Sequence, residues 1–227
     1  TYHSIFLQSP GLDVMIPSFS QEAYDQVLYL LENNNPSVFL EHRWLYKIAS
    51  KLKIKKKIIK SNRATLIKGS KKILLLTYGD GLVECIKTKE ILNKNGLDCS
   101  ILSISYLPSH QRINSNLINC ILDYDNIYLV DTSPFDFGLL NGLLGKILVE
   151  RNNIQKKIVK ISPPFTPCPT STKLSAKYYP TRETILFRIK KDFKIKNNIN
   201  FDKMSFDDVH LNPEFEINKK FRLELIY

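Results

Sequence analysis

The residues of this chain that could do chemistry are few and scattered. None of the four histidines pairs with another type of metal ligand at i+3 or i+4 within an expected helix, and they are His3, His42, His110 and His210. The four cysteines form no C-x-x-C pair, and they are Cys85, Cys99, Cys120 and Cys168. No G-x-S-x-G sequence supplies a serine nucleophile. Zinc sites, disulfide frameworks and serine hydrolases are therefore not supported, and the cysteines fit a reducing cytoplasm.

Two short acidic motifs follow expected strands. Gly79-Asp80-Gly81, with Asn93 and Asn95 after it, offers an acid and an amide of the kind that holds a metal ion on a diphosphate. Too few residues separate them, so we interpret the motif as a strand-to-helix turn and a helix end, and it also fails G-x-G-x-x-G. Asp131-Thr132-Ser133-Pro134 lies where parallel sheets commonly place ligands, but we favour helix capping by Asp131 or Ser133.

The elements that would position these residues alternate between strand and helix, which predicts an α/β fold with a mostly parallel sheet. The expected strands cover 13–16, 38–40, 73–77, 99–104, 127–130 and 157–161. The expected helices run from Ser18 or Ser20 to 32, and over 82–94, 111–122, 137–149 and 181–191, with Gly96 ending the second and Pro180-Thr181 starting the last. Residues 193–227 show no clear periodicity.

Length and composition limit the classes of protein. The chain has 227 residues, 43% of them hydrophobic, which is enough for a sizeable core, and its apolar runs are too short to cross a membrane. Its net charge is +11, but seven lysines without any acid fall within residues 47–60. They alternate with aliphatic residues rather than with arginine and aromatic groups, so we favour a solvated linker over a nucleic-acid surface.

A family resemblance rests on four blocks of sequence. The first two are Ser9–Ser18, SPGLDVMIPS, and Pro36–Tyr46, PSVFLEHRWLY. The others are Leu76-Thr77-Tyr78-Gly79 and the proline-rich stretch Pro163–Pro180. In order and spacing these blocks resemble the β subunits of 2-oxo acid dehydrogenase E1 components, over residues 1 to about 190.

This resemblance implies a three-layer α/β sandwich, the transketolase C-terminal-like domain, preceded by part of a thiamine diphosphate pyrimidine-type domain. The implied boundaries are 1–50 for the pyrimidine-type part, 51–62 for a lysine-rich linker, 63–192 for the C-terminal-like domain and 193–227 for an extension. The 131–142 segment departs from the family, because Phe137 stands where a glycine is usual, and this departure puts docking of E2 in doubt.

The resemblance also implies an oxidoreductase that decarboxylates a 2-oxo acid with thiamine diphosphate and Mg²⁺ and transfers the acyl group to lipoyl. The family's catalytic histidine belongs to a His-Ser-Gln motif, which an ungapped register places just before Thr1. A gapped register would give that role to His3. We favour the ungapped register, and so expect the fragment to be inactive alone and the cofactor to be held mainly by the partner subunit and by sequence upstream of Thr1.

The implied partners are an E1 α subunit, a second β subunit in a heterotetramer, and a lipoyl-bearing E2, with no membrane. The candidate subunit-interface residues are Phe6, Glu41, His42, Arg43, Trp44, Tyr46, Asp131 and Phe135. We also expect the first residues to expose Phe6, Leu7, Leu12 and Val14, and the chain to associate unless the missing part is supplied.

Three alternatives stay open at this point. The chain could be a non-catalytic subunit-assembly module, or a transketolase-like or deoxyxylulose-phosphate-synthase-like enzyme of the same architecture. Nucleic-acid binding through residues 47–60 is a weaker alternative. The 2-oxo acid itself is not readable from these residues.

Overall fold

A computed structural model describes residues 3–48, 50–54, 60–134, 136–151, 154–175, 177–195 and 223–227. The larger of its two sheets has six strands in the order β8-β7-β4-β5-β3-β9. Their bounds are β3 Ala64–Ile67, β4 Ile73–Tyr78, β5 Ser100–Ile104, β7 Asn126–Val130, β8 Lys157–Ile161 and β9 Leu223–Ile226. The four strands from β8 to β5 are mutually parallel, whereas β3 and β9 pair antiparallel. The predicted mostly parallel sheet is confirmed.

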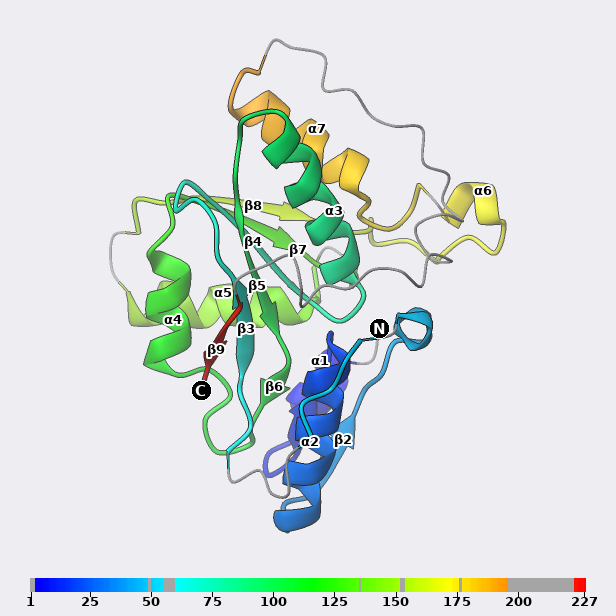
Figure 1. Cartoon of the computed structure of the whole chain (residues 1–227), viewed down its shortest axis with the longest axis vertical. Helices are drawn as coiled ribbons and strands as arrows, with labels where there is room; N and C mark the ends of the chain where they lie inside the picture. The colour runs from blue at the N-terminus through cyan, green and yellow to red at the C-terminus, as the bar shows by residue number, and fades with distance from the viewer. Residues whose placement is uncertain are drawn as a thin grey trace.

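Helices cover both faces of this sheet, as Figure 1 shows. Alternate residues of β4 face opposite ways: Leu74 and Leu76 join one apolar cluster, and Ile73 and Leu75 join the other. The first cluster includes residues of α4, Ser115–Leu122, and α5, Leu139–Glu150. The second includes residues of α3, Gly81–Lys94, and α7, Arg182–Asp192. The sheet is therefore the middle of three layers, as predicted.

A smaller sheet has the order β2-β1-β6. Strands β1, Asp13–Met15, and β2, Ser37–Phe39, are parallel, while β6, Tyr106–Leu107, pairs antiparallel with β1. The helix α2, Ser20–Glu32, connects β1 to β2. The remaining short elements are α1, His3–Leu7, the 3-10 helix η1, Arg43–Lys47, and α6, Thr172–Ser175. Because β6 comes from the later part of the chain, both parts contribute strands to this sheet.

Polar contacts also join the early and later parts of the chain. The Asp13 carboxylate accepts hydrogen bonds from the Tyr106 hydroxyl at 2.8 Å and from the Ser109 amide at 2.6 Å. The Arg112 guanidinium donates to three carbonyl oxygens, those of Ser9 at 2.8 Å, Leu12 at 3.1 Å and Leu107 at 3.2 Å. Residues 9–15 are thereby held against the segment that follows β5.

The expected exposure of the first residues is wrong. Val14 is fully buried, and Phe6 and Leu7 pack as partly buried side chains against the first apolar cluster. Helix α1 contacts both α5 and β1, and these contacts shield the side chains from solvent. Within residues 3–48, the exposed large apolar side chains are instead those of Ile5, Val27, Leu31 and Tyr46.

Most expected helix ends are confirmed, and the starts or caps of three helices are corrected. Helix α5 begins at Leu139 rather than at 137, and Gly138 is its N-cap. Gly96 follows α3 with φ +74°, and the Thr181 side chain caps α7 by accepting the Thr184 amide. Helix α4 begins at Ser115 rather than at 111, because the Asn114 side chain caps it by accepting the Leu117 amide at 2.9 Å. The start of helix α2 is capped by neither the Ser18 nor the Ser20 side chain.

The carboxylate of Glu22 performs that capping, since it accepts the Ser18 amide at 2.9 Å and the Phe19 amide at 3.3 Å. Burial raises the pKa of Glu22. Among the residues that the structure describes, no helix has the length and apolarity required to cross a membrane.

Candidate functional site

The carboxyl ends of parallel strands from both sheets meet in one region. Tyr78 is the last residue of β4, and Asp80 follows that strand. Asp131 follows β7, and His42 lies just after β2. Gly79 lies beside this junction, because a Cβ there would be 3.7 Å from the Ile16 side chain that follows β1. Open α/β sheets commonly bind ligands at such carboxyl ends, so this region is the candidate site.

The buried carboxylate of Asp131 organises one side of the site. Its Oδ1 accepts the Tyr78 hydroxyl at 2.5 Å and the Ser133 amide at 2.8 Å, and the Tyr78 and Ser133 hydroxyls are 2.8 Å apart. Its Oδ2 accepts the Leu140 amide in the first turn of α5 at 3.3 Å and lies 3.9 Å from the Lys160 ammonium. Neither Asp131 nor Ser133 is the N-cap of α5, because that position is Gly138. Asp131 nevertheless accepts an amide of the first turn through the folded chain, and its carboxylate has no exposed surface in this chain.

The same network shapes the environment of Tyr78. Burial raises the pKa of its hydroxyl well above the ordinary value, and the neighbouring Asp131 charge adds to this. Gly138 completes the enclosure, because a Cβ there would lie only 2.0 Å from Asp131 Oδ2. The arrangement holds the start of α5 to the end of β4, and it is a structural network rather than a reactive one.

The imidazole of His42 organises the other side. Its Nε2 lies 3.6 Å from the Asp80 carboxylate, and its ring packs edge-on against Trp44 with centroids 4.8 Å apart. Trp44 in turn packs edge-on against Tyr179, with centroids 6.3 Å apart. Burial raises the pKa of Asp80, while the His42 charge opposes that rise. His42 and Trp44 thus join η1 to the start of α3 and to the segment before α7.

His3 lies on α1 against the ring of Tyr78, with ring centroids 5.1 Å apart. Burial lowers its pKa to about 4, and the nearby His42 adds to this, so the imidazole is neutral at pH 7. Its Nδ1 is buried and has no hydrogen-bond partner among the described residues. A neutral, shielded imidazole is compatible with proton transfer, but no described acid or hydroxyl orients it, and a catalytic role for His3 remains a prediction.

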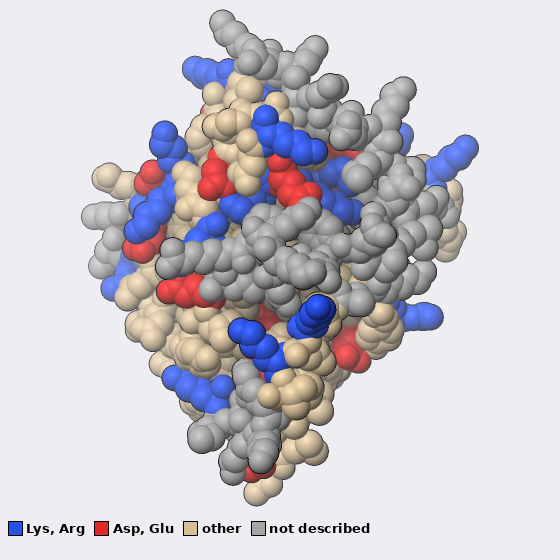
Figure 2. Space-filling view, in the orientation of Figure 1, with Lys and Arg blue, Asp and Glu red and all other residues tan. Residues whose placement is uncertain are grey.

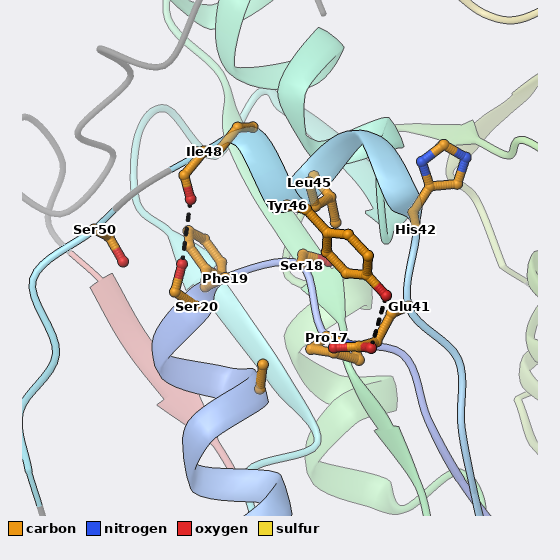
Figure 3. Close-up of a pocket in the computed structure, with 11 residues that line it drawn as sticks. Pro17, Ser18, Phe19, Ser20, Glu41, His42, Leu45, Tyr46, Ile48 and Ser50 are labelled. Carbon is orange, nitrogen blue, oxygen red and sulfur yellow. Dashed lines mark hydrogen bonds between the residues drawn. The ribbon is translucent and has the colours of Figure 1, made fainter.

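A cavity of about 210 Å³ opens next to these groups, between the start of α2 and η1 (Figure 3). Three of the interface candidates line it, namely Glu41, His42 and Tyr46. The Tyr46 hydroxyl donates to Glu41 Oε2 at 2.9 Å, and this pair lies across the mouth from Ser20, as Figure 3 shows. The remaining lining is mostly apolar, and it includes Phe19, Ala23 and Leu45.

The remaining predicted site residues lie around this region. Arg43 and Trp44 belong to η1, Phe6 packs against the core from α1, and Phe135 lies outside the described residues. The structure therefore brings His42 together with Asp80 and Trp44, whereas Tyr46 is hydrogen-bonded to Glu41 at the cavity. Sequence reasoning did not connect His42 with Asp80 or His3 with Tyr78, because nothing in the local sequence signals contacts between residues so far apart.

The Gly79-Asp80-Gly81 motif does not form a metal-diphosphate site with the described residues. Asp80 precedes the first turn of α3, whereas Asn93 and Asn95 lie at its other end, roughly 20 Å away along a 14-residue helix. No group of three or more His, Cys, Asp or Glu side chains could hold a metal ion within the described ranges. The interpretation of the motif as a turn and a helix end is confirmed.

Comparisons with known proteins agree with this architecture. A scan against protein families finds no match. The chain is 22% identical over 191 residues to the β subunit of acetoin:2,6-dichlorophenolindophenol oxidoreductase from Cupriavidus necator, covering 84% of this chain and 56% of that one. It is 32% identical over 101 residues to the pyruvate dehydrogenase E1 β subunit of Staphylococcus aureus, covering 44% of this chain and 31% of that one.

Solved structures show the same fold. A split-gene transketolase, an inactive β4 tetramer, matches with a TM-score of 0.62 at 14% identity, over 86% of this chain and 61% of that one. A Campylobacter jejuni transketolase matches with a TM-score of 0.54 at 18% identity, over 83% and 27%. The chain spans about half the length of the first of its curated relatives and less of the second. It is thus related in sequence to the β subunits of 2-oxo acid dehydrogenase E1 components, and its fold is transketolase-like.

Proposed function

We propose that this chain is the β-subunit portion of a thiamine diphosphate-dependent 2-oxo acid dehydrogenase E1. The observations that carry the proposal are the similarity to a pyruvate dehydrogenase E1 β subunit over 44% of the chain and to an acetoin:2,6-dichlorophenolindophenol oxidoreductase β subunit over 84% of it. The chain also has a transketolase-like fold with two sheets. In this function the assembled enzyme decarboxylates a 2-oxo acid oxidatively and passes the acyl group to lipoyl-E2. The division at residues 1–50, 51–62, 63–192 and 193–227 is part of the proposal.

The described residues do not fit the complete cofactor site. The acid of the Gly79-Asp80-Gly81 turn is paired with His42, and the two asparagines lie at the far end of α3. We therefore assign thiamine diphosphate and Mg²⁺ mainly to the partner subunit and to the family residues that precede the matched region. The described part of this chain contributes packing surfaces around the carboxyl-end region, and His3 is its candidate for a reaction step in the assembled enzyme.

The proposed partners are an E1 α subunit, a second β subunit and a lipoyl-bearing E2. The aromatic segment of η1 supports the first two, because Tyr46 and Glu41 are exposed beside an open cavity. We place the assembly in a reducing cytoplasm, in line with the four free cysteines.

The test is cofactor binding in the presence and absence of the partner. Isothermal titration calorimetry with thiamine diphosphate and Mg²⁺ is performed on the chain alone and on the chain purified with the E1 α subunit of its source organism. We expect saturable binding, and 2-oxo acid-dependent dye reduction, only in the mixture. Tight cofactor binding by the chain alone would contradict this assignment of the site.

A non-catalytic assembly module is the second candidate function. It is favoured by the Asp131 network, which is fully engaged inside the chain, and by His3, which no described group orients for proton transfer. Substitution of His3 by Ala in the assembled enzyme separates the two functions. A loss of kcat by about 100-fold or more, typical of a lost general acid–base, supports a catalytic chain, and unchanged turnover supports the module.

A further inference from the structure

The segment around η1 is joined to the larger sheet by a pair of ionisable side chains. His42 directly precedes η1, and its Nε2 lies 3.6 Å from the carboxylate of Asp80, which directly precedes α3. Asp80 does not cap α3 through its side chain. Among the described residues, no other basic side chain forms an ion pair with this carboxylate. The pair therefore connects the loop after β2 in the smaller sheet to the helix after β4 in the larger one.

The strength of this contact depends on a proton. A distance of 3.6 Å is longer than an ordinary hydrogen bond, so the attraction is mainly between charges. The Asp80 side chain is only 16% exposed, and a shielded carboxylate without an opposite charge is unfavourable. Histidine is the side chain that ordinarily changes its charge between about pH 5 and 8. A protonated His42 compensates the Asp80 charge, whereas a neutral His42 leaves it uncompensated.

Other titratable groups surround His42, and they come from three elements and from its own loop. They are His3 of α1, Tyr78 of β4, Cys168 and Tyr179 before α7, and the exposed neighbours Glu41 and Arg43. Burial lowers the pKa of His3 to about 4, so its imidazole is neutral above about pH 6. Burial raises the pKa of the Tyr78 and Tyr179 hydroxyls, so both stay protonated. The Cys168 thiol contacts Tyr179.

The same cluster supports one wall of the cavity between α2 and η1. The His42 ring packs edge-on against Trp44, and Trp44 packs edge-on against Tyr179 of the segment before α7. His42 and Leu45 line the cavity, and Figure 3 shows the His42 ring apart from the hydrogen bond that crosses the cavity mouth. A movement of η1 away from the start of α3 therefore changes the shape of this cavity.

We propose that His42 and Asp80 form a pH-sensitive latch, which holds η1 against the start of α3 while His42 is protonated and loosens η1 when the imidazole is neutral. The contact favours the protonated imidazole, so its contribution is complete at mildly acidic pH and is lost as pH rises. Burial raises the pKa of Asp80, while the His42 charge opposes that rise, and protonation of the carboxylate sets the acidic limit of the latch. The inference is independent of the proposed function, because it concerns contacts within this chain.

The test is hydrogen exchange of the η1 amides in the full chain at about pH 6 and about pH 8, on either side of an ordinary histidine transition. The reporters are the Leu45 amide, which donates to the His42 carbonyl at 2.9 Å, and the Ile48 amide, which donates to the Leu45 carbonyl at 3.0 Å. Each rate is divided by that of an unstructured peptide of the same sequence at the same pH, and the amides of α4 serve as an internal reference.

The ionic strength separates the local pair from more distant charges. In the face drawn in Figure 2, the described Lys and Arg side chains are interspersed with Asp and Glu. At about 0.15 M salt the screening length is roughly 8 Å, so the pair at 3.6 Å persists while distant charges are screened. The measurement is therefore made at that ionic strength.

Two variants remove the latch and three variants serve as controls. His42→Gln removes the titrating ring, and Asp80→Asn removes the buried charge while it keeps the size of the side chain. The controls are His3→Phe, Cys168→Ser and His110→Gln, the last at an exposed histidine. Circular dichroism checks that each variant is folded. If His42→Gln loosens η1 at every pH, Asp80→Asn still decides the outcome, because it leaves the imidazole in place.

We expect the corrected exchange of the two reporter amides to be about two- to fivefold faster at the higher pH in the wild type, the range for a partly exposed ion pair. This difference should vanish in Asp80→Asn and persist in the three controls. Equal or slower exchange at the higher pH in the wild type overturns the proposal, as does a difference that survives Asp80→Asn. Loss of the difference in His3→Phe or Cys168→Ser also overturns it, because another group is then the one that titrates.

Discussion

The carboxylate of Asp131 should be the most sensitive single group in the fold. Substitution by Ala removes a fully buried acceptor of three hydrogen bonds, from the Tyr78 hydroxyl and the amides of Ser133 and Leu140. It also removes the charge 3.9 Å from the Lys160 ammonium. Breaking a buried charged pair costs about 3–5 kcal/mol, so we expect Asp131→Ala to lower the free energy of unfolding by that amount. That is a large share of the roughly 5–15 kcal/mol of a typical domain.

Two variants control for simpler explanations. Asp131→Asn keeps the shape and one acceptor oxygen, and should cost about 1–2 kcal/mol. Tyr78→Phe removes one of the three donors and should cost about 1 kcal/mol. Urea unfolding followed by circular dichroism measures all three. If Asp131→Ala loses less than about 1 kcal/mol, or no more than Tyr78→Phe, the network is not what fixes α5 to β4 and the reasoning is refuted.

Three further predictions follow from local geometry. Gly138→Ala should destabilise the fold by about 1–3 kcal/mol, because the new Cβ would lie 2.0 Å from Asp131 Oδ2. Gly145→Ala has open space around it inside α5 and should stabilise the fold by about 0.5–1 kcal/mol. Equal effects of the two variants in thermal unfolding would argue against the clash. Arg112→Ala should lower the free energy of unfolding in urea by about 1–3 kcal/mol, because three carbonyl oxygens lose a charged donor. The control Arg188→Ala removes an exposed arginine and should change this free energy little. Equal losses in the two variants would contradict the role given to Arg112. Because burial lowers the pKa of His3 from 6.5 to about 4, the stability that neutral His3 contributes is complete above pH 6.5 and is lost as pH falls towards 4, by about 1–2 kcal/mol after allowance for partial exposure. His3→Phe should flatten that part of the pH–stability curve, and an unchanged curve would show that His3 is not the cause.

Sequence patterns predicted the parts of the fold that local chemistry determines. The buried run of β4, the glycine after α3 and the Thr181 cap are each fixed by neighbouring residues. Strands β3, β6 and β9 were not predicted as strands, because pairing with strands distant in the sequence defines them.

The orientation of α2 shows a second limit of sequence reasoning. Periodicity identifies which residues share a face, but it does not say which face the rest of the chain covers. Here Glu22 and Gln26 find hydrogen-bond partners on β3 and after β5, and this leaves Val27 and Leu31 outside. In the candidate site, the pairing of His42 with Asp80 likewise depends on how the two sheets approach each other, which no local motif encodes.

The central claim is that this chain works as the β-type half of a heteromeric enzyme. The most direct measurement is size-exclusion chromatography with multi-angle light scattering on the chain co-expressed with the E1 α subunit of its source organism. We predict one stable complex that contains both chains, with the mass of an α₂β₂ assembly. Two separate peaks at the masses of the individual chains would contradict the claim.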